Sequence, residues 1–169
     1  LPPVPGVPVY LTGGIILVSA SEDQIGYVES LVVVCFNGLA IKLLAVCIQQ
    51  KVFGEGLGKF VAIRQMVGIN SIAIKAIRKI LEAPGMSFPK VCILVGGPDW
   101  PTSVLTGILK LNLFEMLLGT LPVFLLIVPT VLAGGFQLKK AESDTWDSIA
   151  SMVLGLAAFV QGAGLIAAA

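Results

Sequence analysis

Three apolar runs, each close to the ~20 residues with which a helix spans the hydrocarbon core of a bilayer, constrain this chain more than any other feature. They extend over residues 27–49, 111–136 and 147–169. Pro122 and Pro129 lie inside the second run, where neighbouring helices can satisfy the freed carbonyls, and the third is rich in Gly and Ala, which permit close helix approach. We therefore expect an all-α polytopic membrane protein with about three transmembrane helices.

The composition supports the bilayer as solvent. Of the 169 residues, 56% are hydrophobic and only 12% are charged, whereas soluble domains carry roughly 25% charged residues. Too few polar side chains remain to cover a surface that faces water. The composition therefore excludes a disordered chain, a nucleic-acid-binding domain and an ordinary globular enzyme.

The side-chain inventory narrows the chemistry further. The chain has no His, which excludes a Ser-His-Asp or Cys-His catalyst and a His-bearing zinc site. Cys35, Cys47 and Cys92 lie in apolar runs without CxxC spacing and are predicted to be buried small side chains, with a disulfide or metal role as the alternative. We expect no enzyme, no metal site, and no cofactor apart from bound lipids.

Both ends of the chain are unusual. It begins LPPVPGVPVY, with neither an initiating Met nor a basic segment, so this end does not resemble a secretory signal. It ends GAGLIAAA, inside an apolar run. We expect an incomplete or processed chain.

Two further apolar stretches, residues 4–20 and 90–109, are each interrupted by a Pro/Gly cluster. They predict re-entrant hairpins or broken helices, which occur at membrane depth only where protein or a water-filled cavity covers the irregular backbone. In each stretch two prolines three residues apart are followed, six residues after the second, by a glycine. These residues are Pro5, Pro8 and Gly14 in the first stretch, and Pro98, Pro101 and Gly107 in the second. Corresponding breaks in two halves indicate a repeat-built transporter fold, and coincidence is the alternative.

Residues 58–82, between the halves, have the pattern of an amphipathic helix. Basic and polar side chains lie largely on one face, and apolar residues recur at spacings of three, four or seven on the other. The apolar residues are Phe60, Ile63, Val67, Ile74, Ile77 and Leu81. This pattern predicts a helix on the membrane surface, with a helix packed against a partner subunit as the alternative.

Charge distribution predicts the topology. From Lys51 to Lys90 the chain carries seven basic residues against Glu55 and Glu82. The opposite side is acidic, with Glu22, Asp23, Glu142, Asp144 and Asp147 against Lys139 and Lys140. By the positive-inside bias, the basic connection faces the cytosol, matrix or stroma, which inverts the two halves. The membrane is predicted to be a eukaryotic endomembrane or an organellar one, thylakoid or inner mitochondrial.

Ionisable residues at membrane depth are candidate functional residues, since a charge there is costly and usually faces the bundle interior or a cavity. Glu29, Lys42 and Glu115 lie inside the predicted spans. For Glu29 and Glu115, near the starts of their helices, solvation at the interface is the alternative, and the long stem of Lys42 can reach the interface. Trp100 and Trp146 are expected at membrane interfaces, with Trp100 also a candidate for the substrate path.

The stretches VPGVPVYLTGG and GGPDWPTSVLTGILKLNLFEMLLGTLP resemble the DedA/VTT (SNARE-associated) membrane proteins, over residues 4–136, about four fifths of the chain. The resemblance implies two re-entrant loops that face each other as inverted repeats, with Gly119, Thr120 and Pro122 in the helix after the second loop. It also implies movement of phospholipid or another amphiphile between leaflets. The path would be lined by Pro5, Gly6, Pro8, Gly14, Pro98, Asp99, Trp100, Pro101 and Gly107.

The chain departs from that family at two places. It has Val7 where members often carry an acidic residue, and Val95 and Gly96 where they often carry a basic one. Asp99 is a candidate replacement carboxylate, or else a turn residue that bonds its own backbone. The alternative function is therefore a non-catalytic subunit of a large respiratory or photosynthetic membrane complex. The expected partners are membrane lipids and, in the alternative, other membrane-protein subunits, with no nucleic acid.

Overall fold

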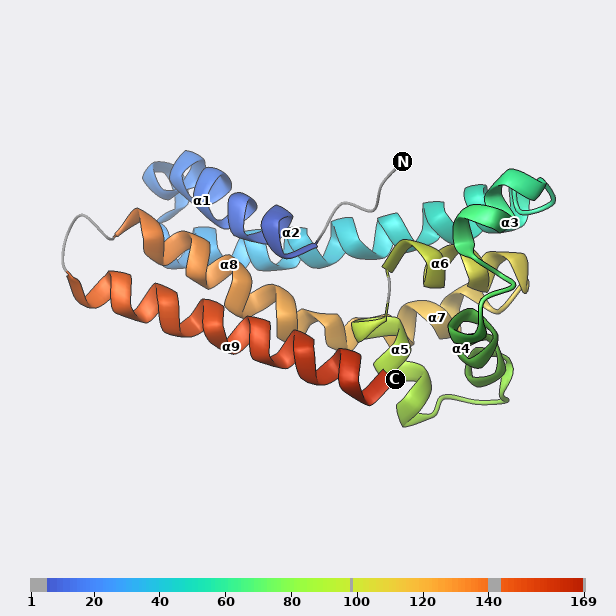
Figure 1. Ribbon diagram of the computed structural model, residues 1–169. Coiled ribbons are helices and arrows are strands. Elements are labelled where there is room, and N and C mark those ends of the chain that lie inside the picture. The colour runs from blue at the N-terminus through green and yellow to red at the C-terminus, as the bar shows by residue number, and fades with distance from the viewer. Residues whose placement is uncertain (1–5, 98, 140–143, 169) are drawn as a thin grey trace. The chain divides into compact units, whose positions relative to one another are not determined.

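Every regular element is helical in the part of the chain that the computed structural model describes, which comprises residues 6–97, 99–139 and 144–168 (Figure 1). This confirms the all-α class. The described residues form two compact units. The first unit comprises the described residues up to Ile41 and from Val123 to Gln161, and the second comprises those from Lys42 to Pro122 and from Gly162 onward. The helices in chain order are α1 (Gly6–Ile25), α2 (Tyr27–Ile48), η1 (Gln49–Gly56), α3 (Val61–Val67), α4 (Ile72–Glu82), α5 (Phe88–Gly96), α6 (Asp99–Ile108), α7 (Leu113–Thr120), η2 (Leu121–Val123), α8 (Phe124–Leu138) and α9 (Asp144–Ala168).

Two of these helices are long and apolar enough to span a membrane. The first is α2 together with the π-helix η1, over Tyr27–Gly56, and the second runs through α7, η2 and α8, over Leu113–Leu138. They match the runs predicted at 27–49 and 111–136, and their length and composition support membrane association. Pro122 lies in the tight 3₁₀ turn η2, where the proline interrupts regular α-helical bonding.

The third predicted span, residues 147–169, is not confirmed. α9 covers most of this range, but its apolar part within the described residues, Thr145–Phe159, is shorter than a span. Near the start of α9, the rings of Trp146 and Phe136 lie 5.4 Å apart. This tryptophan therefore contacts an aromatic side chain of α8.

In the first unit α1 lies along α8 (Figure 1). The hairpin predicted for residues 4–20 is not confirmed, because residues 6–25 form one continuous helix. Pro8 does not break it, since the third residue of a helix has no N–H partner to lose. Gly13 and Gly14 lie in the middle of the helix in spite of their low helix propensity, because packing against a neighbouring helix overrides the local preference.

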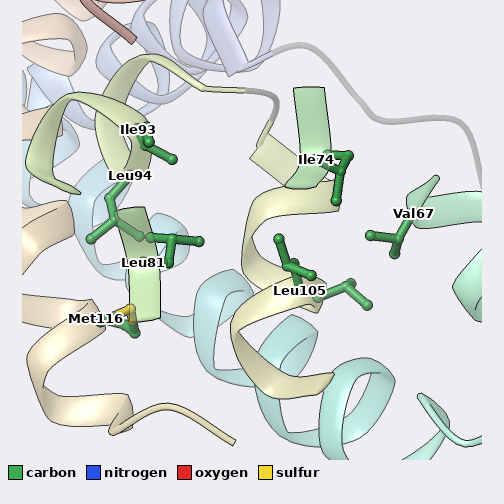
Figure 2. Close-up of a cluster of buried hydrophobic side chains, with 8 residues drawn as sticks. Val67, Ile74, Leu81, Ile93, Leu94, Leu105 and Met116 are labelled. Carbon is green, nitrogen blue, oxygen red and sulfur yellow. The ribbon is translucent and has the colours of Figure 1, made fainter. Parts of the chain in front are cut away.

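The second unit is organised around a cluster of buried apolar side chains (Figure 2). Short helices α3 to α7 all contribute to it, so side chains far apart in the sequence share one core. The buried members are Val67, Ile74, Leu81, Ile93, Leu94, Val104, Leu105 and Met116. Burial of this set in a unit of short helices supplies the stability that helices of about ten residues lack on their own.

The single amphipathic helix predicted for residues 58–82 is wrong in one respect, because the segment forms two helices. Gly68 ends α3 in the left-handed conformation, at φ 70°, and Ser71 caps α4 by accepting a hydrogen bond from Ile74 N at 3.3 Å. The predicted apolar face is real, but Val67, Ile74 and Leu81 pack into the core of the second unit. Most of that face is thus covered by the chain itself.

The stretch predicted as a second hairpin is a broken helix. α5 ends at Gly96, Gly97 has extended backbone, and α6 begins at Asp99. Pro98 lies outside the described residues. The break fits the expectation of a Gly/Pro interruption, because Pro disfavours helical backbone in the residue before it.

Candidate functional site

At Gly14, one of the predicted path residues, two helices of the first unit cross closely at glycines. Gly14 of α1 lies against Gly134 of α8, such that a Cβ added to Gly134 would lie 3.1 Å from the Cα of Gly14. A Cβ added to Gly14 would clash with the carbonyl oxygen of Val131. No side chain fits between the two helices at this point, and their backbones are therefore in direct contact.

The second unit contains a crossing of the same kind. Gly107 of α6 lies against Gly54 of η1, and a Cβ added to Gly54 would lie 2.5 Å from the Cα of Gly107 and 2.6 Å from the oxygen of Val104. A π-helix is rare and is commonly found at functional sites. Here it forms the surface on which α6 packs.

The two crossings occur at equivalent positions of α1 and α6. Pro8 and Pro101 are each the third residue of their helix, and Gly14 and Gly107 are each the ninth. The partners are reciprocal. α1, from the first half of the chain, packs on α8 from the second half, and α6, from the second half, packs on η1 from the first half. The correspondence predicted from the Pro and Gly spacing thus has a structural counterpart inside each unit.

The remaining path candidates have different surroundings. Gly6 opens α1, and Pro8 lines a mostly apolar hollow of about 450 Å³ on the exposed face of α1, with Thr12 and Gly13 beside it. Trp100 packs against the buried cluster of the second unit. Asp99 is the first residue of α6, and the structure describes its backbone only. Pro5 and Pro98 lie outside the described residues.

The three predicted intramembrane ionisable residues do not form one site. Glu29 is exposed in the first turn of α2, where the helix dipole favours a carboxylate. Lys42 is buried further along the same helix. Glu115 lies in the first turn of α7 and forms an ion pair with Lys90 of α5.

That ion pair is the most unusual electrostatic feature of the second unit. Lys90 Nζ lies 3.0 Å from Glu115 Oε1 and donates a second hydrogen bond to the carbonyl of Ala83 at 2.7 Å. Lys90 is the largest fully buried side chain in the described residues, although it is the third residue of an apolar helix. A buried ammonium is tolerated only when paired and hydrogen-bonded, and this one has both partners.

α6 buries three polar side chains in addition to its apolar core residues Val104 and Leu105. These side chains are Thr102, Ser103 and Thr106. The hydroxyl of Thr106 donates a hydrogen bond to the carbonyl of Ser103 at 2.7 Å. Gln50 of η1 is also buried, and its Nε2 donates to the carbonyl of Leu111 at 2.7 Å. Within the described residues, Gln50 Oε1 and the hydroxyl of Thr102 have no hydrogen-bond partner. Buried polar atoms therefore lie on both α6 and η1, the two helices that cross at Gly107 and Gly54.

Several of these residues are not predicted as functional residues from the sequence. The sequence indicates Lys90 only as one of the basic residues of the connection, and Gln50 lies one residue beyond the span predicted for residues 27–49. A lysine at the start of an apolar run, 25 residues before a lone glutamate at the start of the next, is the available signal for the pair. Gly54 and Gly134 had no signal, since neither belongs to the Pro/Gly clusters.

Comparison with known proteins finds no matching family model, no matching curated protein and no matching solved structure. The resemblance to the DedA/VTT proteins therefore depends on the residues quoted for it. Among the described residues no group of three or more Cys, Asp and Glu side chains is placed to hold a metal ion.

Proposed function

We propose that this chain is an integral membrane protein with DedA/VTT-like inverted repeats, which moves a phospholipid or another amphiphile between leaflets. α1 and the broken helix α5–α6 would be the two re-entrant elements, and α9 would supply the third span. Headgroups would pass along a polar break in the protein while acyl chains stay in lipid.

The observation that carries the proposal is the pair of reciprocal glycine crossings. Gly14 and Gly107 occupy the same position in two helices that start with a Pro-containing turn, and each helix packs on an apolar helix of the other half. Apolar segments that contain Pro and Gly at corresponding positions of two halves favour a repeat-built transporter, although only the α5–α6 segment has a broken helix. The buried polar side chains of α6 and the Lys90–Glu115 pair add support, because polar groups are costly in an apolar protein and commonly mark a translocation route.

Reconstitution tests the proposal. The complete chain would be incorporated into phosphatidylcholine liposomes that contain a trace of fluorescent phospholipid, and dithionite would report the fraction of label that reaches the outer leaflet. Faster exchange than in protein-free liposomes, reduced by Gly107→Leu and not by Gly13→Ala, is expected. Exchange no faster than in protein-free liposomes would overturn the proposal.

A second candidate function is that of a non-catalytic subunit in a large organellar membrane complex. It is favoured by the burial of Gly14 and Gly107 against neighbouring backbone, which leaves no open route at either crossing. An apolar hollow of about 270 Å³, lined by Phe36, Phe124 and other side chains of α2 and α8, also offers a seat for a lipid chain or a neighbour's side chain. Purification from native membranes in a mild detergent distinguishes the two, since the subunit would copurify in fixed stoichiometry with other proteins.

A further inference from the structure

A hollow that carries polar side chains lies on the second unit, at the turn between α3 and α4. Its volume is about 620 Å³. Arg64 from α3 and Arg78 from α4 line it, together with Asn70 and Ser71 of the turn. The left-handed Gly68 makes this arrangement, because it reverses the chain and brings the two arginines of separate helices to one hollow.

The charges at this hollow are incompletely neutralised. The connection contains only two acidic residues, Glu55 and Glu82, and these pair with Lys51 at 2.6 Å and Arg78 at 3.0 Å. Arg64 makes no ion pair among the described residues. The bond of Arg78 uses Nε, and its two Nη groups make no hydrogen bond within the same part of the chain. Guanidinium groups with free N–H donors are suited to the oxygens of a phosphate group.

Exposed apolar side chains lie beside the same hollow. Val61 lines it and is exposed, and Ile72, which opens α4 directly after Ser71, is 88% exposed. Met66 of α3 is exposed as well. An exposed basic hollow beside exposed apolar side chains is typical of a protein surface that meets lipid headgroups and the upper acyl region.

We propose that the hollow between α3 and α4 binds a phosphate group, with Arg64 and Arg78 as its ligands and Asn70 and Ser71 as additional hydrogen-bonding residues. The phosphate group is that of an anionic lipid headgroup or of a soluble phosphate compound. This binding site is independent of the proposed lipid movement, and binding is measured without any transport step.

Calorimetric titration of the complete chain in a nonionic detergent tests the site with three probes: inorganic phosphate, dihexanoylphosphatidic acid and dihexanoylphosphatidylcholine. The double variant Arg64→Gln/Arg78→Gln is compared with Lys75→Gln/Lys79→Gln, which removes the same charge from exposed positions of α4 outside the hollow. We expect the arginine variant to weaken binding of an anionic probe at least roughly tenfold, and the lysine variant to weaken it less than about threefold.

The probes separate the sources of the phosphate group. Tighter binding of phosphatidic acid than of inorganic phosphate assigns the site to a lipid headgroup, and equal binding assigns it to soluble phosphate. Glu82→Gln frees Arg78 and is expected to strengthen binding about twofold or more, which keeps the test valid if the arginine variant fails to fold. Absence of binding to all anionic probes, or an equal loss in the arginine and lysine variants, overturns the site.

Discussion

The ammonium group of Lys90 and the carboxylate of Glu115 form an ion pair in which the two partners have unequal access to water. They lie 3.0 Å apart, with the side chain of Lys90 2% exposed and that of Glu115 34% exposed. Lys90 also donates a hydrogen bond to the carbonyl of Ala83. Loss of the carboxylate would leave a buried ammonium, whereas loss of the ammonium would leave a carboxylate that water can still reach.

This asymmetry predicts different costs for the two substitutions. We expect Glu115→Ala to lower the free energy of unfolding by about 2–3 kcal/mol and Lys90→Met to lower it by about 1 kcal/mol. The double variant Lys90→Met/Glu115→Ala should be more stable than Glu115→Ala alone, because no buried charge is left unpaired. Unfolding in mixed detergent micelles, followed by far-UV circular dichroism, measures these differences. Equal costs for the two single variants would contradict the prediction.

The crossing of α1 and α8 gives a test with two adjacent glycines. Gly14→Ala is expected to destabilise the protein by about 1–3 kcal/mol, since its Cβ would meet the backbone at Val131 and Gly134. Gly13→Ala should instead stabilise it by about 0.5–1 kcal/mol, because a Cβ there meets nothing within 4 Å and alanine favours the helix. Thermal unfolding of both variants in the same detergent decides this, and a loss of equal size at Gly13 would mean that no close crossing exists.

Membrane insertion of the Tyr27–Gly56 helix predicts a cost that depends on depth. Ile41, at its middle, and Val52, near its end, are 50% and 51% exposed, so an arginine disturbs the protein core similarly at both. We expect Ile41→Arg to reduce insertion by about 2.5–3.5 kcal/mol and Val52→Arg to reduce it much less, because only the second arginine reaches the interface. Glycosylation-based insertion assays measure the difference. Equal insertion of both variants would argue against a span.

The basic connection and the acidic last turns of α1, which contain Glu22 and Asp23, are expected on opposite sides of the membrane. In a variant whose three native cysteines are replaced by alanine, Lys75→Cys and Asp23→Cys each place one thiol at an exposed position. An impermeant maleimide should label the cysteine at position 75 from the cytosolic, matrix or stromal side, and the cysteine at position 23 from the opposite side. Labelling of both thiols from the same side of sealed vesicles would contradict this topology.

Much of the helical organisation is predictable from local patterns. The apolar runs identify the helices over Tyr27–Gly56 and Leu113–Leu138, and the period of α4 places Ile74 and Leu81 on one face. Pro8 and Gly14 have the same spacing as Pro101 and Gly107, and these residues occupy matched positions in α1 and α6. Each of these signals depends on residues close together in the chain, and hydrogen bonding along one helix is enough to turn them into structure.

Local sequence patterns are enough to predict that the protein is helical and apolar, and that Pro and Gly recur at the same spacing in two stretches of the chain. The contacts of Gly14 and Gly107 depend on the tertiary fold, because Gly134 and Gly54 lie far in the chain from the glycines they meet. In the folded protein most of the apolar face of α3 and α4 packs against the core of the second unit. Lys90 forms an ion pair with Glu115, 25 residues further along the chain. Close packing and the pairing of buried charge depend on which helices meet, and composition and periodicity do not encode that choice.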